Sequence, residues 1–485
     1  MKSISKADTE SHCSVAIVGG GFTGTVLAAE LLRRDGSMFV TLIEPAKIAG
    51  RGVAYSTSCS WHLLNVPAGN MSAFPEDPQN FLRWARSHYD SEARAEDFLP
   101  RRVYGQYIEA VLRDSIRDNS QRFRLVRDEA RAIEISDNLA RIRFSGEKSI
   151  TASRVVLALG NFQPSNTPLS GVPRETRRYL NSAWKIGPVE FEELAQEESI
   201  LLVGSGLTAV DVAIALRAQE FNGTIHIVSR HGLLPLGHEI EAPESAAWDR
   251  DLPSSIRELL NAVRWEIARA EQQGRDWRCV IDSLRPVTAQ IWQSLPLIEK
   301  RRFLRHVRPY WDVHRHRIAP RIYEEIRAGL EDGGIQLHAG RITQYYEEDK
   351  AAVVSYRERK SGEVKHLRVG RVINCTTPET DCRKVGSPLL QNLLAVGLVR
   401  PDPLSLGLDV AEDGALIAED GQLSHLLYTL GPALKGKLWE SIAVPEIREQ
   451  IARLAATLVE RSNQGPVREE RWADVAYSDR EQVNF

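Results

Sequence analysis

Short apolar runs, each ending in glycine or a polar turn, recur along this chain in a fixed order. Residues 14–18 form the first run, 19–24 a glycine-rich turn, 25–34 an Ala- and Leu-rich stretch, and 39–43 a second apolar run. Uninterrupted apolar runs of this length are typical of strands that are buried on both faces of a parallel sheet. The order therefore predicts a strand, a turn, a helix and a second parallel strand, joined by a right-handed crossover.

The same order of elements returns near the middle of the chain. An apolar run at 200–203 precedes the turn 204–209, the apolar helical stretch 210–218 and another run at 225–228. Two such units predict an α/β fold with two Rossmann-like dinucleotide-binding domains. Further buried strands are expected at three other apolar runs, 154–159, 371–375 and 426–430.

The segment 240–330 breaks this alternation. It has an amphipathic helical pattern, a dense mixture of charges and five of the ten tryptophans of the chain. We therefore predict a helical insertion that lies against the α/β units.

Composition excludes several classes of protein. The chain has 62 Lys and Arg against 65 Asp and Glu, a net charge of −3, so it lacks the broad positive field of nucleic-acid-binding proteins. No apolar stretch approaches the roughly 18–20 residues of a membrane span, and the polar N-terminus does not resemble a signal peptide. The five cysteines include no C-x-x-C pair, which opposes a zinc ribbon or a dithiol redox motif. A cytoplasmic protein without nucleic-acid or membrane partners is expected, and its oligomeric state stays open.

The first glycine turn has the G-x-G-x-x-G spacing of a dinucleotide-binding fingerprint in its required place between strand and helix. Its glycines permit a tight turn, close approach of a pyrophosphate and close packing of helix on strand. The helix N-terminus offers free N–H groups to the phosphates, and the carboxylate of Glu44 can accept hydrogen bonds from an adenosine ribose. The alternative is a glycine turn without a ligand. The candidate residues are Gly19, Gly21, Phe22, Thr23, Gly24 and Glu44.

The second turn ends in alanine, which the fingerprint allows, but no acidic residue follows at the end of the next strand. Arg230 occupies that position, where a guanidinium accommodates the 2′-phosphate of NADP(H). A solvated surface arginine is the alternative. The candidate residues are Gly204, Gly206, Leu207, Thr208, Ala209, Ser229, Arg230 and His231.

Two dinucleotide units in one chain suggest two different dinucleotides, with FAD in the first unit and NADPH in the second. The expected division of the chain follows from this pairing. The FAD-binding domain would comprise 13–185 and 385–485, and the NADPH-binding domain 190–384, including the helical insert 240–330.

Five segments outside the glycine turns also resemble a known group of proteins. The chain resembles the flavoproteins with two dinucleotide-binding domains, which include glutathione reductases and class B flavin monooxygenases. Within them it is similar to the FAD/NAD(P)-binding proteins that neighbour the N-hydroxylating monooxygenases. The segments are GRGVAYSTSCSWHLLNVPAGNMSAFP (50–75), FLPRRVYGQYI (98–108), SRHGLLPLGH (229–238), RPYWDVHRHRIAP (308–320) and GPALKGKLWESIAVPEIREQ (431–450).

The resemblance implies a set of flavin-facing residues. Arg51 and Asn65 would be the catalytic candidates, near the isoalloxazine, although both are also compatible with structural roles in their loop. Tyr104 would support them or belong to the core. Pro432 stands where related flavoproteins have the Asp that contacts the ribityl chain, so that contact is absent or supplied otherwise. The implied cofactor-binding residues are Tyr55, His62, Leu64, Val66, Met71, Arg101, Gly160, Gly431, Ala443 and Val444.

The resemblance implies an NADPH-dependent monooxygenase in which a flavin C4a-(hydro)peroxide transfers oxygen to a small substrate, such as an amine. The lack of paired cysteines opposes a disulfide reductase, and the F-x-G-x-x-x-H-x-x-x-W fingerprint of Baeyer–Villiger enzymes is missing. Two alternatives stay open. One is an NADPH:acceptor reductase without oxygenation, and the other is a flavin-containing redox sensor without turnover.

A cluster of arginines and histidines at 305–317 invites a metal-site interpretation. Metal ligation favours neutral imidazoles with carboxylate or thiolate neighbours, and the interleaved arginines oppose a divalent cation. We therefore expect no metal. An anion site or a solvated helix face are the two interpretations that fit this pattern.

Overall fold

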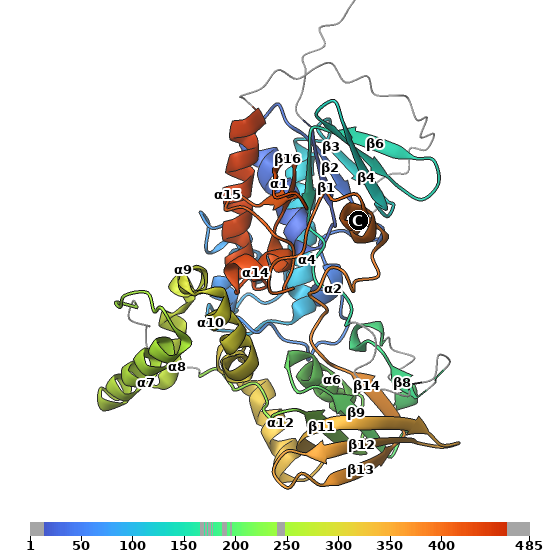
Figure 1. Ribbon diagram of the computed structural model, residues 1–485, viewed down its shortest axis with the longest axis vertical. Helices are drawn as coiled ribbons and strands as arrows, with labels where there is room; N and C mark the ends of the chain where they lie inside the picture. Colours follow the sequence, from blue (N-terminus) through green and yellow to red (C-terminus); the bar gives the residue numbers. More distant parts are fainter. Residues whose placement is uncertain are drawn as a thin grey trace, which may run out of the picture.

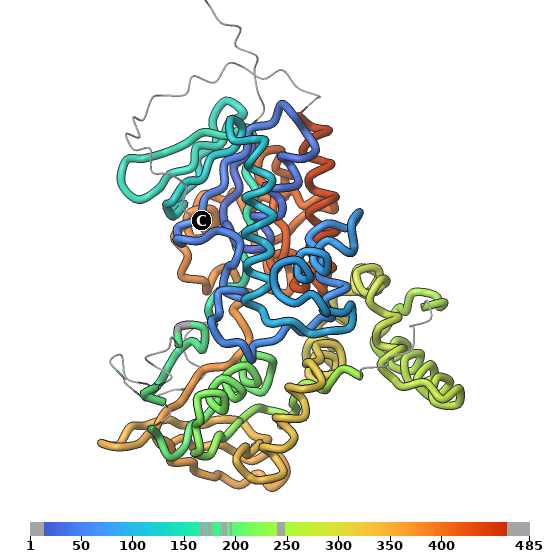
Figure 2. Tube along the Cα trace, turned by 180° about the vertical axis from the view of Figure 1, so that it is seen from behind, coloured from blue at the N-terminus to red at the C-terminus, as the bar shows by residue number. Residues whose placement is uncertain are grey.

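The computed structural model describes residues 14–462 except 165–168, 170, 171, 173–175, 177, 187–191, 195 and 240–247. Two α/β halves stack along the long axis of the molecule, and a helical arm projects from one side (Figure 1). Figure 2 shows the same division from behind. None of the described helices is long and apolar enough to cross a membrane.

The first half contains a six-stranded sheet in the order β15-β16-β7-β1-β2-β3. Five of its strands are parallel, and β15 pairs antiparallel with β16 at one edge. Among the described residues, the last two strands therefore complete a sheet that the first strands begin. The bounds are β1 Ser14–Val18, β2 Phe39–Ile43, β3 Phe123–Val126, β7 Arg154–Leu157, β15 Ala415–Ile417 and β16 Leu423–Thr429.

Helices cover this sheet because each has an apolar face that only the sheet or another helix can bury. α1 is buried nearly all round and packs against both α4 and α15. On α15 the buried residues recur every three or four positions, as an amphipathic surface helix requires. The bounds are α1 Phe22–Arg34, α4 Arg101–Arg117 and α15 Val444–Ser462.

A small antiparallel sheet, β4-β5-β6, accompanies the first half. Helix α13 packs on it, and the Asn392 side chain accepts a hydrogen bond of 3.0 Å from the Ile133 backbone N–H. The bounds are β4 Ala132–Ser136, β5 Leu139–Arg143, β6 Ser149–Ala152 and α13 Pro388–Ala395.

The second half contains a seven-stranded sheet in the order β13-β12-β11-β10-β9-β14-β8. β8, β14, β9, β10 and β11 are parallel, and β11 continues into an antiparallel meander with β12 and β13. Separate apolar clusters lie on it, one of which includes α6 and α12. The bounds are β8 Tyr179–Leu180, β9 Ser199–Val203, α6 Leu207–Ala218, β10 Thr224–Ser229, α12 Pro320–Glu331, β11 Ile335–Glu347, β12 Ala352–Glu358, β13 Val364–Val369 and β14 Arg371–Asn374.

The predicted fold class is confirmed: the protein has two Rossmann-like α/β sheets, and each contains a strand followed by a glycine turn and a helix. One helix of the predicted insert 240–330, α12, belongs to the second α/β half instead of the insert. Helix α12 contacts α6 and β11, and it forms the crossover between the parallel strands β10 and β11. A parallel pair requires such a crossover, and the amphipathic pattern alone could not separate it from the insert.

The remaining helices of that segment form the arm, which has its own apolar cluster. Leu406 and Trp439 of the first half complete this cluster, so the arm is anchored beside α14 (Lys435–Leu438). The bounds are α7 Ile256–Gln272, α8 Trp277–Ser283, α9 Thr288–Ser294, α10 Leu297–Arg302, the π-helical turn Phe303–Val307 and α11 Arg308–Arg315.

A buried ion pair joins the two halves. The Arg101 guanidinium at the start of α4 donates two hydrogen bonds, of 2.7 and 3.0 Å, to the Asp211 carboxylate on α6. Its Nε also donates to the Leu63 carbonyl at 2.9 Å. His62 donates from Nε2 to the Asp211 carbonyl at 3.0 Å and shares a hydrogen bond of 2.7 Å with Thr57. Burial lowers the pKa of His62, although the Asp211 carboxylate opposes this shift.

Replacing Asp211 with Asn should leave a buried guanidinium without a countercharge and lower the free energy of unfolding by about 3–5 kcal/mol. Urea denaturation followed by tryptophan fluorescence would measure this loss. Asp114→Asn is the control, because the Arg117–Asp114 pair is exposed and its loss should cost less than about 1 kcal/mol. Equal losses in the two variants would contradict a special role for the buried pair.

Candidate dinucleotide sites

The first glycine turn contains two kinds of glycine. At Gly19, where φ is +107°, a Cβ atom would lie 2.3 Å from the Ala158 carbonyl oxygen, and at Gly24 it would lie 1.9 Å from the Gly19 oxygen. Packing within the protein therefore requires both glycines. At Gly21 the nearest atom would be the Cα of Gly52, at 3.5 Å. The space beside Gly21 is open, so the protein itself does not require a glycine there, whereas a diphosphate passing close to the backbone would.

The start of α1 has the features of an anion site. Gly21 is its N-cap and no side chain caps the first turn, so N–H groups of this turn remain available. The Glu44 carboxylate accepts hydrogen bonds from the backbone N–H of Gly20 at 2.7 Å and of Ala46 at 2.9 Å. Glu44 follows β2 directly, at the position where a ribose is expected, and its carboxylate fixes the glycine turn through the Gly20 N–H.

Residues from the C-terminal part of the chain meet the start of α1. A Cβ on Gly431, where φ is +77°, would lie 3.4 Å from the Thr23 hydroxyl. The Gly431 N–H donates to the Gln450 side-chain oxygen at 2.8 Å. The Gln450 side-chain nitrogen is buried and has no hydrogen-bond partner within the described residues. A buried amide donor without a partner is costly, so this place suits a polar group of a ligand.

The other predicted residues of the first half differ in their burial and backbone conformation. Gly160, after β7, has a φ of +66°, and a Cβ added to it would meet no heavy atom within 4 Å. Val444 is buried as the first residue of α15, and the Ala443 carbonyl accepts the Ile447 N–H at 3.0 Å. Leu64 and Met71 are buried in the core of the first half, and Val66 packs against it.

An aromatic cluster lies beside the glycine turn. The Tyr104 ring lies 5.9 Å from Phe22, 4.8 Å from Tyr55 and 5.0 Å from Phe81, measured between ring centroids. The Tyr104 hydroxyl is buried without a hydrogen-bond partner in the described part of the chain. Burial raises the pKa of Tyr104 well above its usual value and that of Tyr55 to about 12, although Arg101 opposes the latter shift. Both phenols therefore stay neutral hydrogen-bond donors.

Four of the predicted flavin-facing residues have partners in the protein. Arg51 forms an ion pair with Glu109 on α4. His62 and Arg101 take part in the ion-pair network that joins the two halves. The backbone carbonyl of Asn65 accepts a hydrogen bond of 3.1 Å from the His238 side chain of the second half. The contacts that these four residues make are therefore structural, and three of the four serve the interface between the halves.

The second glycine turn repeats the geometry of the first. At Gly204, where φ is +104°, a Cβ would lie 2.8 Å from the Cys375 carbonyl oxygen. At Gly206, the N-cap of α6, no heavy atom lies within 4 Å of that position, and no side chain caps the helix. Leu207 and Thr208 are half-buried, whereas Ala209 is buried against the core. This turn is therefore also open toward a phosphate-bearing ligand.

Positive charge gathers where β10 ends. Arg230 is exposed. The pKa of the neighbouring His231 is lowered mainly by burial, and further by the positive charges of Arg359 and Arg230. The Ser229 hydroxyl accepts hydrogen bonds from Ser205 at 2.8 Å and from the Gly232 N–H at 3.1 Å, which fixes the turn. Sequence analysis missed Arg359, since it follows β12 and only the folded sheet brings it near β10.

The described cysteines are poor nucleophiles. Cys59, Cys279, Cys375 and Cys382 are all unpaired. Burial raises the pKa of Cys382 to about 11 and raises that of the other three thiols as well. These thiols stay protonated at neutral pH, so none has the low pKa of a redox-active cysteine.

The Arg/His cluster at 305–317 is largely neutralised by carboxylates. Arg315 pairs with Glu446 at 3.0 Å, Arg317 with Asp282 at 2.5 Å and Arg308 with Asp312 at 3.4 Å. These pairs weaken the anion-site interpretation. Within the described ranges, no three His, Cys, Asp or Glu side chains gather in a way that could hold a metal ion.

Comparisons with known proteins agree with this geometry. A family model described as FAD-NAD(P)-binding matches residues 16–162. The chain is 24% identical over 425 residues to Rv3403c, an uncharacterized protein of Mycobacterium tuberculosis (strain ATCC 25618 / H37Rv), and the match covers 78% of this chain and 76% of that protein.

Two solved structures share most of the fold. The ornithine hydroxylase PvdA of Pseudomonas aeruginosa, in its reduced form, matches with a TM-score of 0.65 and 14% identity over 93% of this chain and 99% of PvdA. The cadaverine monooxygenase DfoA of Erwinia amylovora, solved bound to FAD, matches with a TM-score of 0.65 and 14% identity over 96% of this chain and 99% of DfoA. The chain thus shares the fold of these two proteins, and its residues 16–162 match the FAD-NAD(P)-binding family model.

Proposed function

We propose that this protein is an NADPH-dependent, FAD-containing monooxygenase that oxygenates a small substrate. The observation that supports this proposal most strongly is the pair of open glycines, Gly21 and Gly206. Each stands at the N-terminus of a helix that follows a buried strand, and packing inside the protein explains neither of them. Two dinucleotides in one chain provide a route for hydride transfer from one to the other.

The residues of the first half fit FAD. The turn Gly19–Gly24 and the N-terminus of α1 would hold its diphosphate, and Glu44 would accept hydrogen bonds from its adenosine ribose. The unpartnered Gln450 amide and the neutral Tyr104 hydroxyl would donate to polar groups of the flavin end. When bound, FAD would supply the hydride acceptor and the centre at which oxygen is activated.

The residues of the second half fit NADPH. The open turn at Gly206 and the N-terminus of α6 would hold the diphosphate. Arg230 and Arg359 would bind the 2′-phosphate, which a guanidinium recognises through charge-assisted hydrogen bonds. His231, whose pKa is lowered, would be neutral at pH 7 and would add a hydrogen bond but no charge.

Oxygenation is favoured over transfer of electrons to a disulfide. A thiol pathway needs a reactive cysteine pair near the flavin, and the described cysteines are unpaired with raised pKa values. The ion pair between Arg101 and Asp211 holds the two halves in one orientation. The structural neighbours PvdA and DfoA are a hydroxylase and a monooxygenase by name, which supports the same choice.

Rapid mixing of the NADPH-reduced protein with oxygenated buffer tests the proposal. We expect a transient absorption spectrum that matches neither reduced nor oxidised flavin and that lasts longer when NADP⁺ is present. Direct reoxidation without such a spectrum would favour an NADPH:acceptor reductase. Failure of NADPH to bleach the flavin would favour a redox sensor.

Gly21→Ala should weaken FAD binding without unfolding the protein. The added methyl group meets only Gly52 within the protein but would occupy the space of the diphosphate. We expect FAD affinity to fall at least about tenfold, or about 1.4 kcal/mol, in a titration of the apoprotein. Gly36→Ala is the control, since Gly36 is exposed and has no neighbour within 4 Å of a Cβ. Full flavin occupancy in Gly21→Ala would remove the first turn from the site.

Arg230→Ala should weaken NADPH but not NADH. Loss of a charged hydrogen bond to the 2′-phosphate costs about 1.5–3 kcal/mol, which is roughly 10- to 150-fold in Kd. Arg359→Ala should act in the same direction. Arg327→Ala, an exposed arginine paired with Glu331 on α12, is the control. Equal weakening of both nicotinamide cofactors would contradict the 2′-phosphate assignment.

A further inference from the structure

The helical arm places an exposed tyrosine beside the turn that follows β10. Tyr310 belongs to α11, and its ring lies 6.0 Å from the His231 ring, edge to face, measured between ring centroids. His231 directly follows Arg230, the residue that would bind the 2′-phosphate of NADPH. A residue of the arm therefore reaches the part of the second half where the adenosine end of the cofactor is expected.

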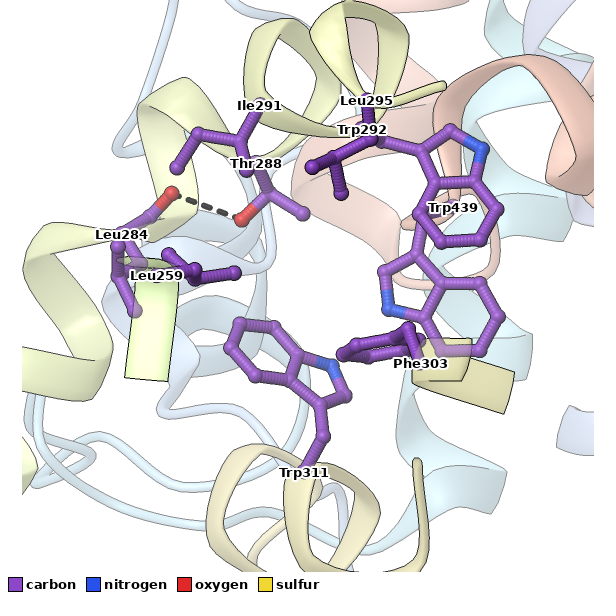
Figure 3. Close-up of a pocket in the computed structure, with 9 residues that line it drawn as sticks. All are labelled: Leu259, Leu284, Thr288, Ile291, Trp292, Leu295, Phe303, Trp311 and Trp439. Atoms are coloured by element: carbon purple, nitrogen blue, oxygen red, sulfur yellow. Dashed lines mark hydrogen bonds between the residues drawn. The ribbon is translucent and has the colours of Figure 1, made fainter. Parts of the chain in front are cut away.

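Helix α11 presents different residues to the inside of the arm and to the second half. Trp311 lines the small apolar pocket inside the arm, as Figure 3 shows, and its ring packs edge-on against Phe303. Consecutive residues of a helix point about 100° apart, so Tyr310 lies on another face. Val313 shares that face, and its backbone carbonyl accepts a hydrogen bond of 3.1 Å from the Leu236 N–H of the second half. The helix is thus held against the segment that follows β10.

The ring of Tyr310 is not used in the packing of the arm. Tyr310 is 48% exposed, whereas its neighbours Val307 and Trp311 pack against the apolar cluster of the arm. Single exposed rings are common on protein surfaces, and it is the surroundings of Tyr310 that indicate a ligand.

Two exposed arginines gather beside the same histidine. Burial lowers the pKa of His231, and the charges of Arg359 and Arg230 lower it further, so both guanidinium groups lie near the imidazole. Ala339, the last residue of β11 that pairs with β10, brings their segments together. Its carbonyl accepts a hydrogen bond of 2.8 Å from the Arg359 N–H, and a Cβ on Gly232 would lie 2.8 Å from its own Cβ. Positive charge and an accessible aromatic ring are the two features that recognise a phosphorylated nucleoside.

We propose that Tyr310 stacks on the adenine ring of NADPH, so that the helical arm completes the cofactor site of the second half. This inference rests on the proposed function, because it takes the 2′-phosphate to lie at Arg230. Adenine and the 2′-phosphate are attached to neighbouring carbons of one ribose, so a ring beside the guanidinium is within reach of the base. Stacking does not depend on the phosphate, which separates the role of Tyr310 from that of Arg230.

Calorimetric titration of the FAD-loaded protein with NADP⁺ and NAD⁺ tests this assignment. Tyr310→Ala should weaken both cofactors by the same factor, at least about fivefold, because both contain adenine. Tyr310→Phe keeps the face of the ring and should bind both cofactors as the wild-type protein does. Arg230→Ala should give a different pattern, since it removes a contact that only the phosphorylated cofactor makes.

Tyr346→Ala is the matched control. Tyr346 is 43% exposed and lies in the antiparallel part of β11, beyond the residues that pair with β10. Its removal should leave the binding of NADP⁺ unchanged.

Stacking also has a spectroscopic signature that a merely structural tyrosine would not produce. The probe is 2′,5′-ADP, which contains the adenine and the 2′-phosphate but no nicotinamide. Its binding should lower the ultraviolet absorbance of adenine in the wild-type protein and in Tyr310→Phe, and this decrease should be lost in Tyr310→Ala. The thermal unfolding midpoint should be the same in all three proteins, because the ring is exposed.

Two results would overturn the role of Tyr310 and leave the NADPH site intact: unchanged binding in Tyr310→Ala, or a loss of affinity confined to NADP⁺. Failure of the wild-type protein to bind NADP⁺ and 2′,5′-ADP would overturn both this inference and the proposed NADPH site.

Discussion

The buried contact between Arg101 and Asp211 is the interaction on which the arrangement of the two halves depends. The Arg101 guanidinium binds a carboxylate of the second half and the Leu63 carbonyl of its own half, while the neighbouring His62 binds the backbone carbonyl of Asp211. The charges are nearly inaccessible to water, with side-chain exposures of 8% and 13%. Neither can be left alone at low cost, so the halves separate only if the whole network opens.

A second constraint on the fold is the lack of space for a side chain at several glycines. Gly19, Gly24 and Gly204 are required because a side chain would collide with the backbone of an adjacent element. Gly21 and Gly206 meet no such obstacle. The contrast separates glycines that serve the fold from glycines that leave space, and only the second kind points to a ligand.

Much of the fold could be predicted because its signals are local. The strands at residues 14–18 and 199–203, and the turns after them, are encoded in a few consecutive residues. The antiparallel strand β13 was missed, because its exposed charges obscure a strand pattern. The crossover helix α12 and the arm helices have the same amphipathic pattern, and only the pairing of β10 with β11 distinguishes them.

In the candidate sites, too, the features encoded locally could be predicted, and the contacts between distant residues could not. The glycine turns were readable from spacing, whereas the partners of Arg51, Asn65 and Arg101 were not, because Glu109, His238 and Asp211 lie far along the chain. The proximity of Arg359 to His231 likewise exists only in the folded sheet. A pattern identifies which residues are suited to bind a ligand, and the tertiary structure decides whether they already bind the protein.

The place of β16 in the first sheet has a consequence for synthesis of the protein. β16 pairs with β7, and the whole second half lies between these two strands in the chain. During translation, the second half leaves the ribosome complete while β7 still exposes the edge that β16 will cover. An unprotected parallel edge of Val155 and Val156 must therefore persist until residue 429 has emerged. Chaperone dependence of folding in vivo would arise in this interval, before the last strand arrives.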